Sequence, residues 1–407
     1  MKKVLLVLAL FSLFATGLFA SAARIDGMGL GAAAWMVQDQ YLAYKYFPQM
    51  VSEYNNSAVV EASNNTYGYV DLSCLNGVVG IIANSPSASV IAPAVNSSGA
   101  IYSMGNLGFG ITYGSTNLEN LTGAITGNSE GTYTSSHAYN IGLDAGYTMD
   151  LKKNMPLNIG LNINIPSNYS QDNETKTNGV TTAINKNGTT GVEANLDGRL
   201  ALQNDMLANV NIGLVQSNNL IFAEGFTAAG VLNAHTEEAT NSTTFNLQLG
   251  GSKTVKVGTV DLFVGAQPSL SMINSLESNK DIFNNAILAG NGNKSSETTV
   301  SLPIFAGVEG KVNDTWVVRG GVNKAIWTVD SLTTVTKLAN GNTATNNTIN
   351  TTTSGSPAVS LGITGVFGDV TIDGDVSTGI LMNGPYFITG NQSNPFISQV
   401  ALTYAWK

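Results

Sequence analysis

Charge, cysteine and long apolar runs are all scarce in this 407-residue sequence. Charged residues make up 11% of the chain, whereas soluble domains carry about 25%, so the surface is not that of an ordinary soluble domain. Cys74 is the only cysteine, which excludes an intrachain disulfide. After residue 23 no apolar run reaches the about 18 residues that a spanning helix needs, which excludes a helical-bundle membrane protein. The net charge of −9 disfavours nucleic-acid binding, because phosphate contacts need clustered Lys and Arg.

Glycine, aromatic and uncharged polar residues take the place of the missing charge. The chain has 44 Gly, 14 Phe and 14 Tyr, and 43% of its residues are apolar. The regular recurrence of apolar residues argues against a disordered chain, which combines low hydrophobicity with high charge. Low charge, abundant glycine and many aromatics without a long apolar run point to an all-β protein that faces lipid.

The first residues have the composition of an export signal. Two lysines precede an apolar stretch over residues 4–14, and a small-x-small cleavage site ends at Ala22. We therefore expect a bacterial signal peptide over residues 1–22 and a single-domain mature chain over 23–407. A retained membrane anchor is the alternative, but it needs a longer apolar run. No cysteine directly follows the cleavage site, which excludes a lipoprotein anchor.

Strict alternation of apolar and polar residues recurs along the mature chain. Such alternation places successive side chains on opposite faces of a strand. Residues 139–147 are the clearest example, and the pattern returns over residues 155–165. In the first stretch the apolar face carries Tyr139, Ile141, Leu143, Ala145 and Tyr147, and the polar face carries Asn140, Gly142, Asp144 and Gly146.

The lengths of the apolar stripes and of the connections favour a membrane barrel over a soluble sandwich. The stripes persist for about 9–13 residues, the length at which a tilted strand crosses a bilayer, whereas soluble strands average about 5–6 residues. Short turns alternate with long polar stretches, which we interpret as periplasmic turns and extracellular loops. The turns fall at 150–154, 203–206, 256–258, 313–314 and 368–369, and the long loops near 166–189, 216–243, 271–297, 328–356 and 378–396.

These patterns predict an all-β fold, an antiparallel up-and-down transmembrane β-barrel of about fourteen strands in the bacterial outer membrane, with both termini in the periplasm. Because the first two strands alternate weakly, a barrel of about twelve or sixteen strands is also compatible. No repeat or linker indicates a second domain. The expected strands, over 67–406, lie at 67–73, 75–84, 105–114, 136–148, 155–165, 190–202, 207–215, 243–254, 259–270, 298–312, 314–326, 357–367, 369–377 and 397–406.

The last strand resembles the C-terminal signal that delivers barrel proteins to the bacterial assembly machinery. Gln399, Leu402, Tyr404 and Trp406 lie in an alternating stretch that ends in aromatics. Lys407 departs from the pattern, because the aromatic is usually the last residue. The resemblance implies that the assembly machinery is a partner of the chain. For a lipid-facing barrel in the outer membrane, we also expect outer-membrane lipid and lipopolysaccharide as partners.

Residues 24–56 do not alternate. Their segments 24–29, 38–39 and 47–50 resemble the opening of FadL-like and PorV-like outer-membrane barrels, which runs from a small-residue A-M-G-G stretch through an Asp-containing segment to N-P-A-x-L. The neighbours of Pro48 differ from the Asn and Ala of that motif. The residues that carry the resemblance include Arg24, Asp26, Gln38, Asp39 and Pro48.

In FadL-like transporters this region folds inside the barrel as a plug or hatch. The resemblance therefore implies that residues 24–56 form a plug in the lumen, where Trp35 and the nearby aromatics would pack. A flexible periplasmic tail is the alternative.

The polar faces of the expected strands carry more acidic than basic residues. An acidic excess in a wet lumen would concentrate cations and exclude anions. Asn, Gln, Ser, Thr and Gly make up most of the remaining lining, and inward Phe263, Phe305 and Val317 would mark contact with a plug or an apolar ligand. The faces depend on register, because a shift of one residue exchanges them. The charged lumen residues are Asp144, Glu193, Asp197, Asp261, Glu309, Asp373 and Asp375, opposed by Arg199, Lys253, Lys311 and Arg319.

Catalytic and metal-binding patterns are weak. His137 lies at an expected strand end, and His235 lies in an expected loop before Glu237 and Glu238. No pattern in the sequence positions a Ser nucleophile against the side chain of either histidine, as nucleophilic catalysis would need. The Asp-Gly-Asp sequence at 373–375 lacks the further ligands of an EF-hand loop. We therefore expect no enzyme, no metal site and no cofactor.

Three functions are compatible with these observations. The preferred hypothesis is a porin-like channel for passive passage of small solutes, with a mild cation preference. The second is a FadL-like transporter of hydrophobic molecules. The third is a structural or adhesive surface barrel, whose Asn/Thr-rich loops contact partners or neighbouring barrels of a homo-oligomer.

Overall fold

The computed structural model describes residues 21–28, 30–37, 39–62, 66–86, 95–122, 129–152, 155–177, 180–227, 231–281, 286–287, 291–337, 342–352, 357–376 and 397–406. Residues 1–20 of the expected signal peptide, Gln38 and the expected loop at 378–396 lie outside the described residues. None of the helices in the described part is long and apolar enough to cross a membrane.

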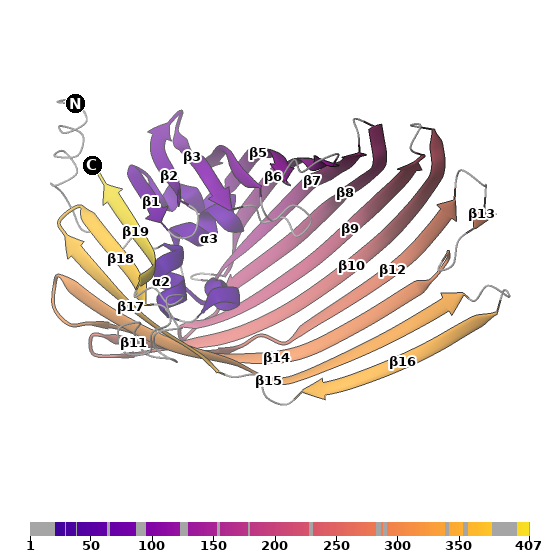
Figure 1. The fold of residues 1–407 in the computed structure, drawn as a ribbon. Helices are drawn as coiled ribbons and strands as arrows, with labels where there is room; N and C mark the ends of the chain where they lie inside the picture. Colours follow the sequence, from indigo (N-terminus) through magenta and orange to yellow (C-terminus); the bar gives the residue numbers. More distant parts are fainter. Residues whose placement is uncertain are drawn as a thin grey trace, which may run out of the picture.

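Nineteen strands in the described ranges form one antiparallel sheet (Figure 1). Most of them pair with the strands that precede and follow them along the chain. They are β1 (Ser57–Ala62), β2 (Thr66–Cys74), β3 (Gly77–Pro86), β4 (Asn96–Met104), β5 (Leu107–Thr122), β6 (Ser129–Lys152), β7 (Met155–Thr177), β8 (Val180–Ala201), β9 (Met206–Phe226), β10 (Leu232–Val257), β11 (Val260–Ala266), β12 (Ser269–Asp281), β13 (Ala286–Ile287), β14 (Lys294–Lys311), β15 (Trp316–Lys337), β16 (Thr343–Thr352), β17 (Ala358–Phe367), β18 (Val370–Val376) and β19 (Ile397–Ala405).

The sheet closes on itself because β1 pairs with both β2 and β19. β11 and β12 share one place in the ring, since both pair with β10 and β14. β16 and β17 share another place beside β15, and in the described part β13 pairs with β12 alone. Counted over the described residues, the closed barrel therefore has 16 strands.

The prediction of about fourteen strands is wrong, because the pattern missed β1 and β4. The barrel begins at Ser57 rather than at residue 67. β1 has six residues, and a fully buried acid, Glu61, interrupts its apolar face. β4 opens with Asn96 and Ser97, so its apolar stripe is too short to stand out.

Exposed side chains on the sheet are mostly apolar and buried ones mostly polar, the reverse of a soluble protein. On β6, Tyr139 and Leu143 are 43% and 42% exposed, whereas Asn140 between them is 2% exposed. The predicted alternation is therefore confirmed, and the exposed face forms an apolar belt of the kind that covers lipid-facing barrels. The belt includes Phe109, Ile111, Tyr113, Leu161, Ile165, Leu196, Ile212, Leu214, Leu249, Val264, Ile304, Val318, Leu361, Ile363 and Ile372.

The long strands continue far beyond this belt on the side away from the short turns (Figure 1). β6 to β10 contain 24, 23, 22, 21 and 26 residues, many more than the about 9–11 that cross a bilayer. Thr189, for example, still pairs with Asn168 and Asn219. Thr favours the strand conformation even where the strand lies in water, and pairing within the hairpins satisfies the backbone hydrogen bonds. The strands therefore continue despite their polar composition. The expected long loops at 166–189, 216–243, 271–297 and 328–356 are consequently wrong over most of their length.

Residues 21–54, here called the N-terminal segment, form short helices. These are α2 (Ala22–Gly27), η1 (Gly31–Met36), α3 (Gln40–Lys45) and η2 (Pro48–Tyr54). Ser21 and Asp39 cap α2 and α3, because their side-chain oxygens accept hydrogen bonds from backbone N–H groups of the first turn. Pro48 occupies the first position of η2, where its missing N–H costs nothing.

The buried apolar side chains of the molecule gather on the N-terminal segment. Leu30, Trp35 and Phe47 belong to one cluster with Phe263 and Phe305 of the strands. Phe263 and Phe305, which were expected to contact a plug or an apolar ligand, therefore pack against the N-terminal segment. Figure 1 shows α2 and α3 lying among the first and last strands of the sheet.

The exposed belt can be tested with a charge placed at two heights of one strand face. Ile212→Arg on β9 should lower the free energy of unfolding by about 2–4 kcal/mol, because the guanidinium would enter lipid near mid-membrane. Asn218→Arg, on the same face of β9 but above the belt, should cost about 0–1 kcal/mol. Urea unfolding in lipid vesicles measures both values. Equal costs for the two variants would contradict a lipid-facing belt.

Candidate functional site

Five charged side chains form a continuous series of ion pairs between the N-terminal segment and the sheet; we call it the ion-pair chain. Arg24 of α2 donates from Nε and Nη2 to the two oxygens of Glu309 on β14, both at 2.8 Å. Arg319 of β15 lies 3.2 Å from Glu309 Oε2 and donates to Asp373 Oδ1 on β18 at 2.9 Å. At the other end, Arg24 Nη1 lies 3.6 Å from Asp39 Oδ2.

The ion-pair chain is shielded from water. Its side chains are between 0% and 12% exposed. Burial opposes the charge on Arg24, but the hydrogen bonds and charge of Glu309, together with Asp39 and Asp373, outweigh it and raise the pKa of Arg24 above its usual value. Burial raises the pKa of Asp39 to about 7, against the opposing charge of Arg24. Asp39 therefore changes its charge near neutral pH, whereas Arg24 stays charged.

A second anchor lies on β1. The carboxylate of Glu61 accepts hydrogen bonds from the backbone N–H of Ala23 at 2.7 Å and of Ala22 at 3.3 Å, at the start of α2. Gln399 of β19 donates to the same carboxylate. Glu61 thus joins the first strand, the last strand and the N-terminal segment at the seam where the barrel closes.

A third anchor lies on β2. Asp71 is fully buried and accepts hydrogen bonds from the Gln40 amide and the Tyr44 hydroxyl of α3. The ring of Tyr44 stacks on Tyr69, with ring centroids 4.4 Å apart. These contacts hold α3 against the first strands of the ring.

Further anchors come from the opposite strands. Trp35 Nε1 donates to Gln267 Oε1 at 3.1 Å, next to β11. Arg199 of β8 donates from Nε to the Trp35 carbonyl at 2.8 Å. Ser103 of β4 donates to the Gln49 carbonyl at 2.7 Å. Polar contacts therefore reach the N-terminal segment from strands spread around the whole ring.

Two strand glycines let the backbone of the N-terminal segment come close. A Cβ atom at Gly160 of β7 would collide with the carbonyl oxygen of Tyr46, and one at Gly321 of β15 would collide with that of Met28. Because the obstacle is backbone in both cases, a side-chain rotation could not relieve it. The glycines predicted to face inward thus include positions that accommodate this segment.

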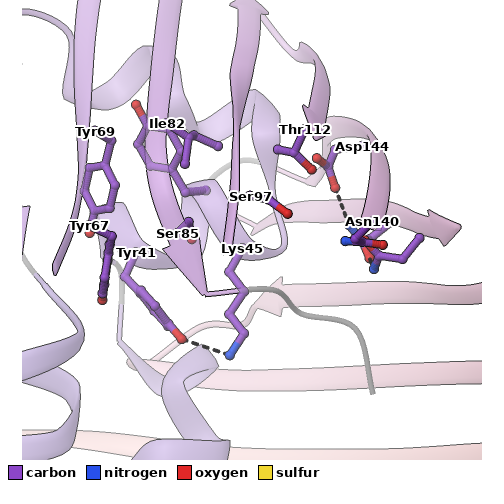
Figure 2. A pocket seen from close by; sticks show the side chains of 13 residues that line it. Tyr41, Lys45, Tyr67, Tyr69, Ile82, Ser85, Ser97, Thr112, Asn140 and Asp144 are labelled. Atoms are coloured by element: carbon purple, nitrogen blue, oxygen red, sulfur yellow. Dashed lines mark hydrogen bonds between the residues drawn. The ribbon is translucent and has the colours of Figure 1, made fainter. Parts of the chain in front are cut away.

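A cavity of about 180 Å³ lies between α3 and strands β2 to β7 (Figure 2). Lys45 lines it and donates from Nζ to the hydroxyl of Tyr41, one turn earlier in α3, at 2.9 Å. The ammonium also lies 5.2 Å from the ring centroid of Tyr46, within cation–π range. Four tyrosines form one side of the lining, and Thr112, Asn140 and Asp144 lie on the other. A second cavity of about 500 Å³ lies between the segment and strands β7 to β11.

The other predicted lumen acids lie outside the ion-pair chain. Asp197 accepts a hydrogen bond from Asn211 at 2.8 Å, and Asp144 accepts one from Asn162. Glu193 is 1% exposed and lies on the same face of β8 as Asp197. These carboxylates are each paired with neutral groups or buried along β6 and β8, rather than gathered at one point.

The remaining charged lumen candidates are more scattered. Asp261 is half-buried on β11 and stands opposite Glu309 in register. Asp375 bonds to the start of β19. Lys253 and Lys311 were expected among the charges of the lumen. They are instead exposed near the short turns, away from the buried charges.

The residues predicted for the plug and those predicted for the assembly signal lie in different parts of the chain. Asp26 lies on α2, where burial and the charge of Asp375 raise its pKa to about 6. Gln38 lies outside the described residues. On β19, Leu402 is 36% exposed in the apolar belt, and Tyr404 stacks on Trp406 with centroids 5.8 Å apart.

Each histidine has a neighbour on an adjacent strand. His137 Nδ1 lies 3.0 Å from Asn117 Oδ1, and His235 Nδ1 lies 3.3 Å from Glu224 Oε1. No group of three or more His, Cys, Asp or Glu in the described ranges is placed to hold a metal ion.

Sequence reasoning missed the anchors on β1 and β2. Glu61 and Asp71 both stand in phase with apolar or aromatic residues of the buried face, Val59 in β1 and Tyr69 in β2. An acid in phase with such residues was the available signal, because burying it requires partners of its own.

No protein-family model matches the sequence, and no curated protein matches it. Solved structures do show likeness. The Ralstonia pickettii toluene transporter TbuX is 10% identical, with a TM-score of 0.40 over 96% of this chain and 98% of that one. The CymD monoaromatic hydrocarbon channel is 9% identical, with a TM-score of 0.38 over 94% and 96%. The copper transporter OprC is 9% identical, with a TM-score of 0.42 over 79% of this chain, which spans only 45% of OprC.

The chain is an outer-membrane-type β-barrel. Its ring of strands and its exposed apolar face establish the barrel, and the likeness to FadL-like toluene transporters is weak.

Removing one carboxylate from the ion-pair chain tests how strongly it holds the segment. Glu309→Gln leaves Arg24 and Arg319 buried without their shared partner, so the free energy of unfolding should fall by about 3–5 kcal/mol. Glu297→Gln, on the same strand above the ion-pair chain, should stay within about 0.5 kcal/mol of the unmodified protein. Urea unfolding in detergent micelles, followed by tryptophan fluorescence, measures both. A small effect of Glu309→Gln would show that the ion pairs are not what fixes the segment.

Asp39 predicts a pH dependence of stability. Its pKa is raised from 3.8 to about 7 in the folded protein, so the folded state holds this proton more tightly than the unfolded state. The stabilising contribution is complete below pH 3.8 and is lost as the pH rises through about 7. Asp39→Asn should therefore flatten the unfolding free energy between these pH values, whereas exposed Asp150→Asn should not. An unchanged pH profile for Asp39→Asn would refute this assignment.

Proposed function

We propose that the N-terminal segment lies in the bore of the barrel as a plug, and that the protein is a restricted, porin-like channel for small solutes. The observation that carries this proposal is the distribution of anchors. The ion-pair chain, Glu61, Asp71 and Trp35 tie one short segment to strands on all sides of the ring. A tail attached outside a barrel could reach only a few neighbouring strands.

The polar faces of the strands support passage of small hydrophilic solutes around the plug. The two cavities lie between the segment and the strands, and Asn, Ser, Thr and Asp line them on the strand side. Asp144 and Asp197 outnumber Lys45 in the lining of the two cavities, because Arg24 and Arg319 belong to the ion-pair chain. A mild preference for cations follows from that balance.

One observation favours the second candidate, a transporter of hydrophobic molecules. Tyr41, Tyr44, Tyr67, Tyr69 and Ile82 line one side of the cavity of about 180 Å³. The larger cavity is lined mainly by amides, so the polar hypothesis fits more of the available space.

We further propose that the chain is exported to the outer membrane of a Gram-negative bacterium after loss of residues 1–22. The short turns and both termini would face the periplasm, and the long polar hairpins would face the outside. Tyr404 of β19 and Trp406, which follows the strand, would be recognised by the assembly machinery. Lipid and lipopolysaccharide would then cover the apolar belt.

Single-channel recording in a planar bilayer with a KCl gradient tests the channel. The refolded mature chain should give small, cation-selective steps, and deleting residues 24–50 should enlarge them several-fold because the plug is lost. Arg24→Ala, which weakens the same attachment without shortening the chain, should give intermittent large steps. Asp197→Asn should lower cation selectivity, whereas exposed Asp150→Asn should leave it unchanged.

The outcomes separate the three hypotheses. Inserted protein that stays silent with the plug deleted would contradict the channel and favour a structural barrel. Silent protein that speeds toluene entry into liposomes would favour the hydrophobic transporter.

A further inference from the structure

The cavity of about 500 Å³ has a regular polar wall. Its volume lies within the about 300–1,000 Å³ typical of small-molecule sites. Asn and Gln supply most of its lining. The strand register places them in rows across β8, β9 and β10, with Asp197, Asn211 and Gln248 side by side in one row and Asn195 and Asn246 flanking Gly213 in the next. Sheet geometry spaces such groups about 4.8 Å apart across strands and about 6.6 Å along them.

Gly213 lets the two flanking amides come close together in the middle of this wall. A Cβ atom there would lie 2.8 Å from Asn195 Oδ1 and 3.4 Å from Asn246 Cβ. The side chains of Asn195 and Asn246 therefore take the space that a side chain at position 213 would need. A ligand on this wall can meet both carboxamides at once.

Several amides of the wall have no partner of their own. Gln267 donates to Gln248 at 2.7 Å, but the side-chain amides of Asn195, Asn209 and Asn246 make no hydrogen bond to any described residue. Each carboxamide can both donate and accept hydrogen bonds. A hydroxyl group also both donates and accepts, so it complements them, whereas an apolar ligand would cover them without replacing the hydrogen bonds of water.

Aromatic side chains of the N-terminal segment face this wall. Trp35, Tyr46 and Phe47 line the cavity from the other side. The Trp35 ring is fixed by its hydrogen bond to Gln267 at 3.1 Å. A ligand between the two sides would meet ring faces on one side and amides on the other, which suits a molecule with C–H faces and a hydroxylated rim.

The cavity carries little net charge. Lys45 and Asp197 both line it, and Asp197 is already bonded to Asn211. Opposite unit charges leave no excess to select an anion or a cation. A neutral ligand is therefore favoured over an ionic one.

We propose that this cavity binds a neutral polyhydroxylated solute, a mono- or disaccharide. The inference deepens the proposed function, on which it rests, by naming the substrate class of the channel. The ring of the sugar would lie on the aromatic side, and its hydroxyls would pair with Asn195, Asn209 and Asn246.

Binding of maltose and of glucose to the mature chain, in a detergent without a sugar headgroup, tests the proposal by calorimetry. Saturable binding of one of them is expected. Asn209→Leu and Asn246→Leu should each weaken it at least about tenfold, because the shape is kept and the amide is lost. Asn218→Leu, on the exposed face of β9, is the matched control and should bind as the unmodified protein does. Asn246→Gln should restore part of the affinity.

Absence of binding of both sugars by folded protein would overturn the proposal, and so would binding that the two cavity variants leave unchanged. Toluene that binds in their place and is displaced by neither sugar would also overturn it. Conductance of the same preparation separates the two claims. Open steps without sugar binding contradict only the saccharide site, whereas sugar binding without open steps supports that site and contradicts the channel.

Discussion

The pairing of β1 with β19 closes the sheet, and that closure gives the molecule two unlike surfaces. A closed ring has no unpaired edge in lipid, so the backbone imposes no further demand on the outer face, which can be wholly apolar. The inner face is then free to hold groups that would be costly elsewhere. Glu61 lies at the seam itself and bonds to Gln399 across it, so one carboxylate contacts both strands of the seam and the N-terminal segment.

Buried charge in this protein is tolerable because it is shared. Glu309 contacts both Arg24 and Arg319, and each arginine contacts two carboxylates. Asp39 lies at one end of that series, where Arg24 is its one ion-pair partner among the described residues and the backbone N–H of Tyr41 donates a hydrogen bond to it. The end of the series is where burial outweighs pairing, and the raised pKa of Asp39 follows from that position. The attachment of the segment through Glu309 is therefore firm, whereas its attachment through Asp39 changes with the protonation of that carboxyl group.

The alternation of apolar and polar residues predicted much of the fold and little of the candidate site. The apolar belt around Leu143 and Ile212 followed directly from the two-residue period, as did most strands. The long hairpins did not, because a polar stretch rich in Asn usually indicates a loop, whereas here each neighbouring strand continues the hydrogen-bond ladder. The contact of Arg24 with Glu309 joins residues that are 285 positions apart. A periodic pattern cannot predict such a contact, because the contact depends on how many strands the ring contains and how far each strand is staggered.

The backbone bond of Ala23 to Glu61 has a consequence for maturation. Cleavage after Ala22, at the site that the sequence predicts, would convert the amide nitrogen of Ala23 into a terminal ammonium. That nitrogen already lies 2.7 Å from the carboxylate. The bond from Ala22 would disappear, and a neutral hydrogen bond would become a fully charged pair in a dry setting. The same cleavage would remove Ser21, the cap of α2, so the new ion pair between Ala23 and Glu61 would take over the start of the segment.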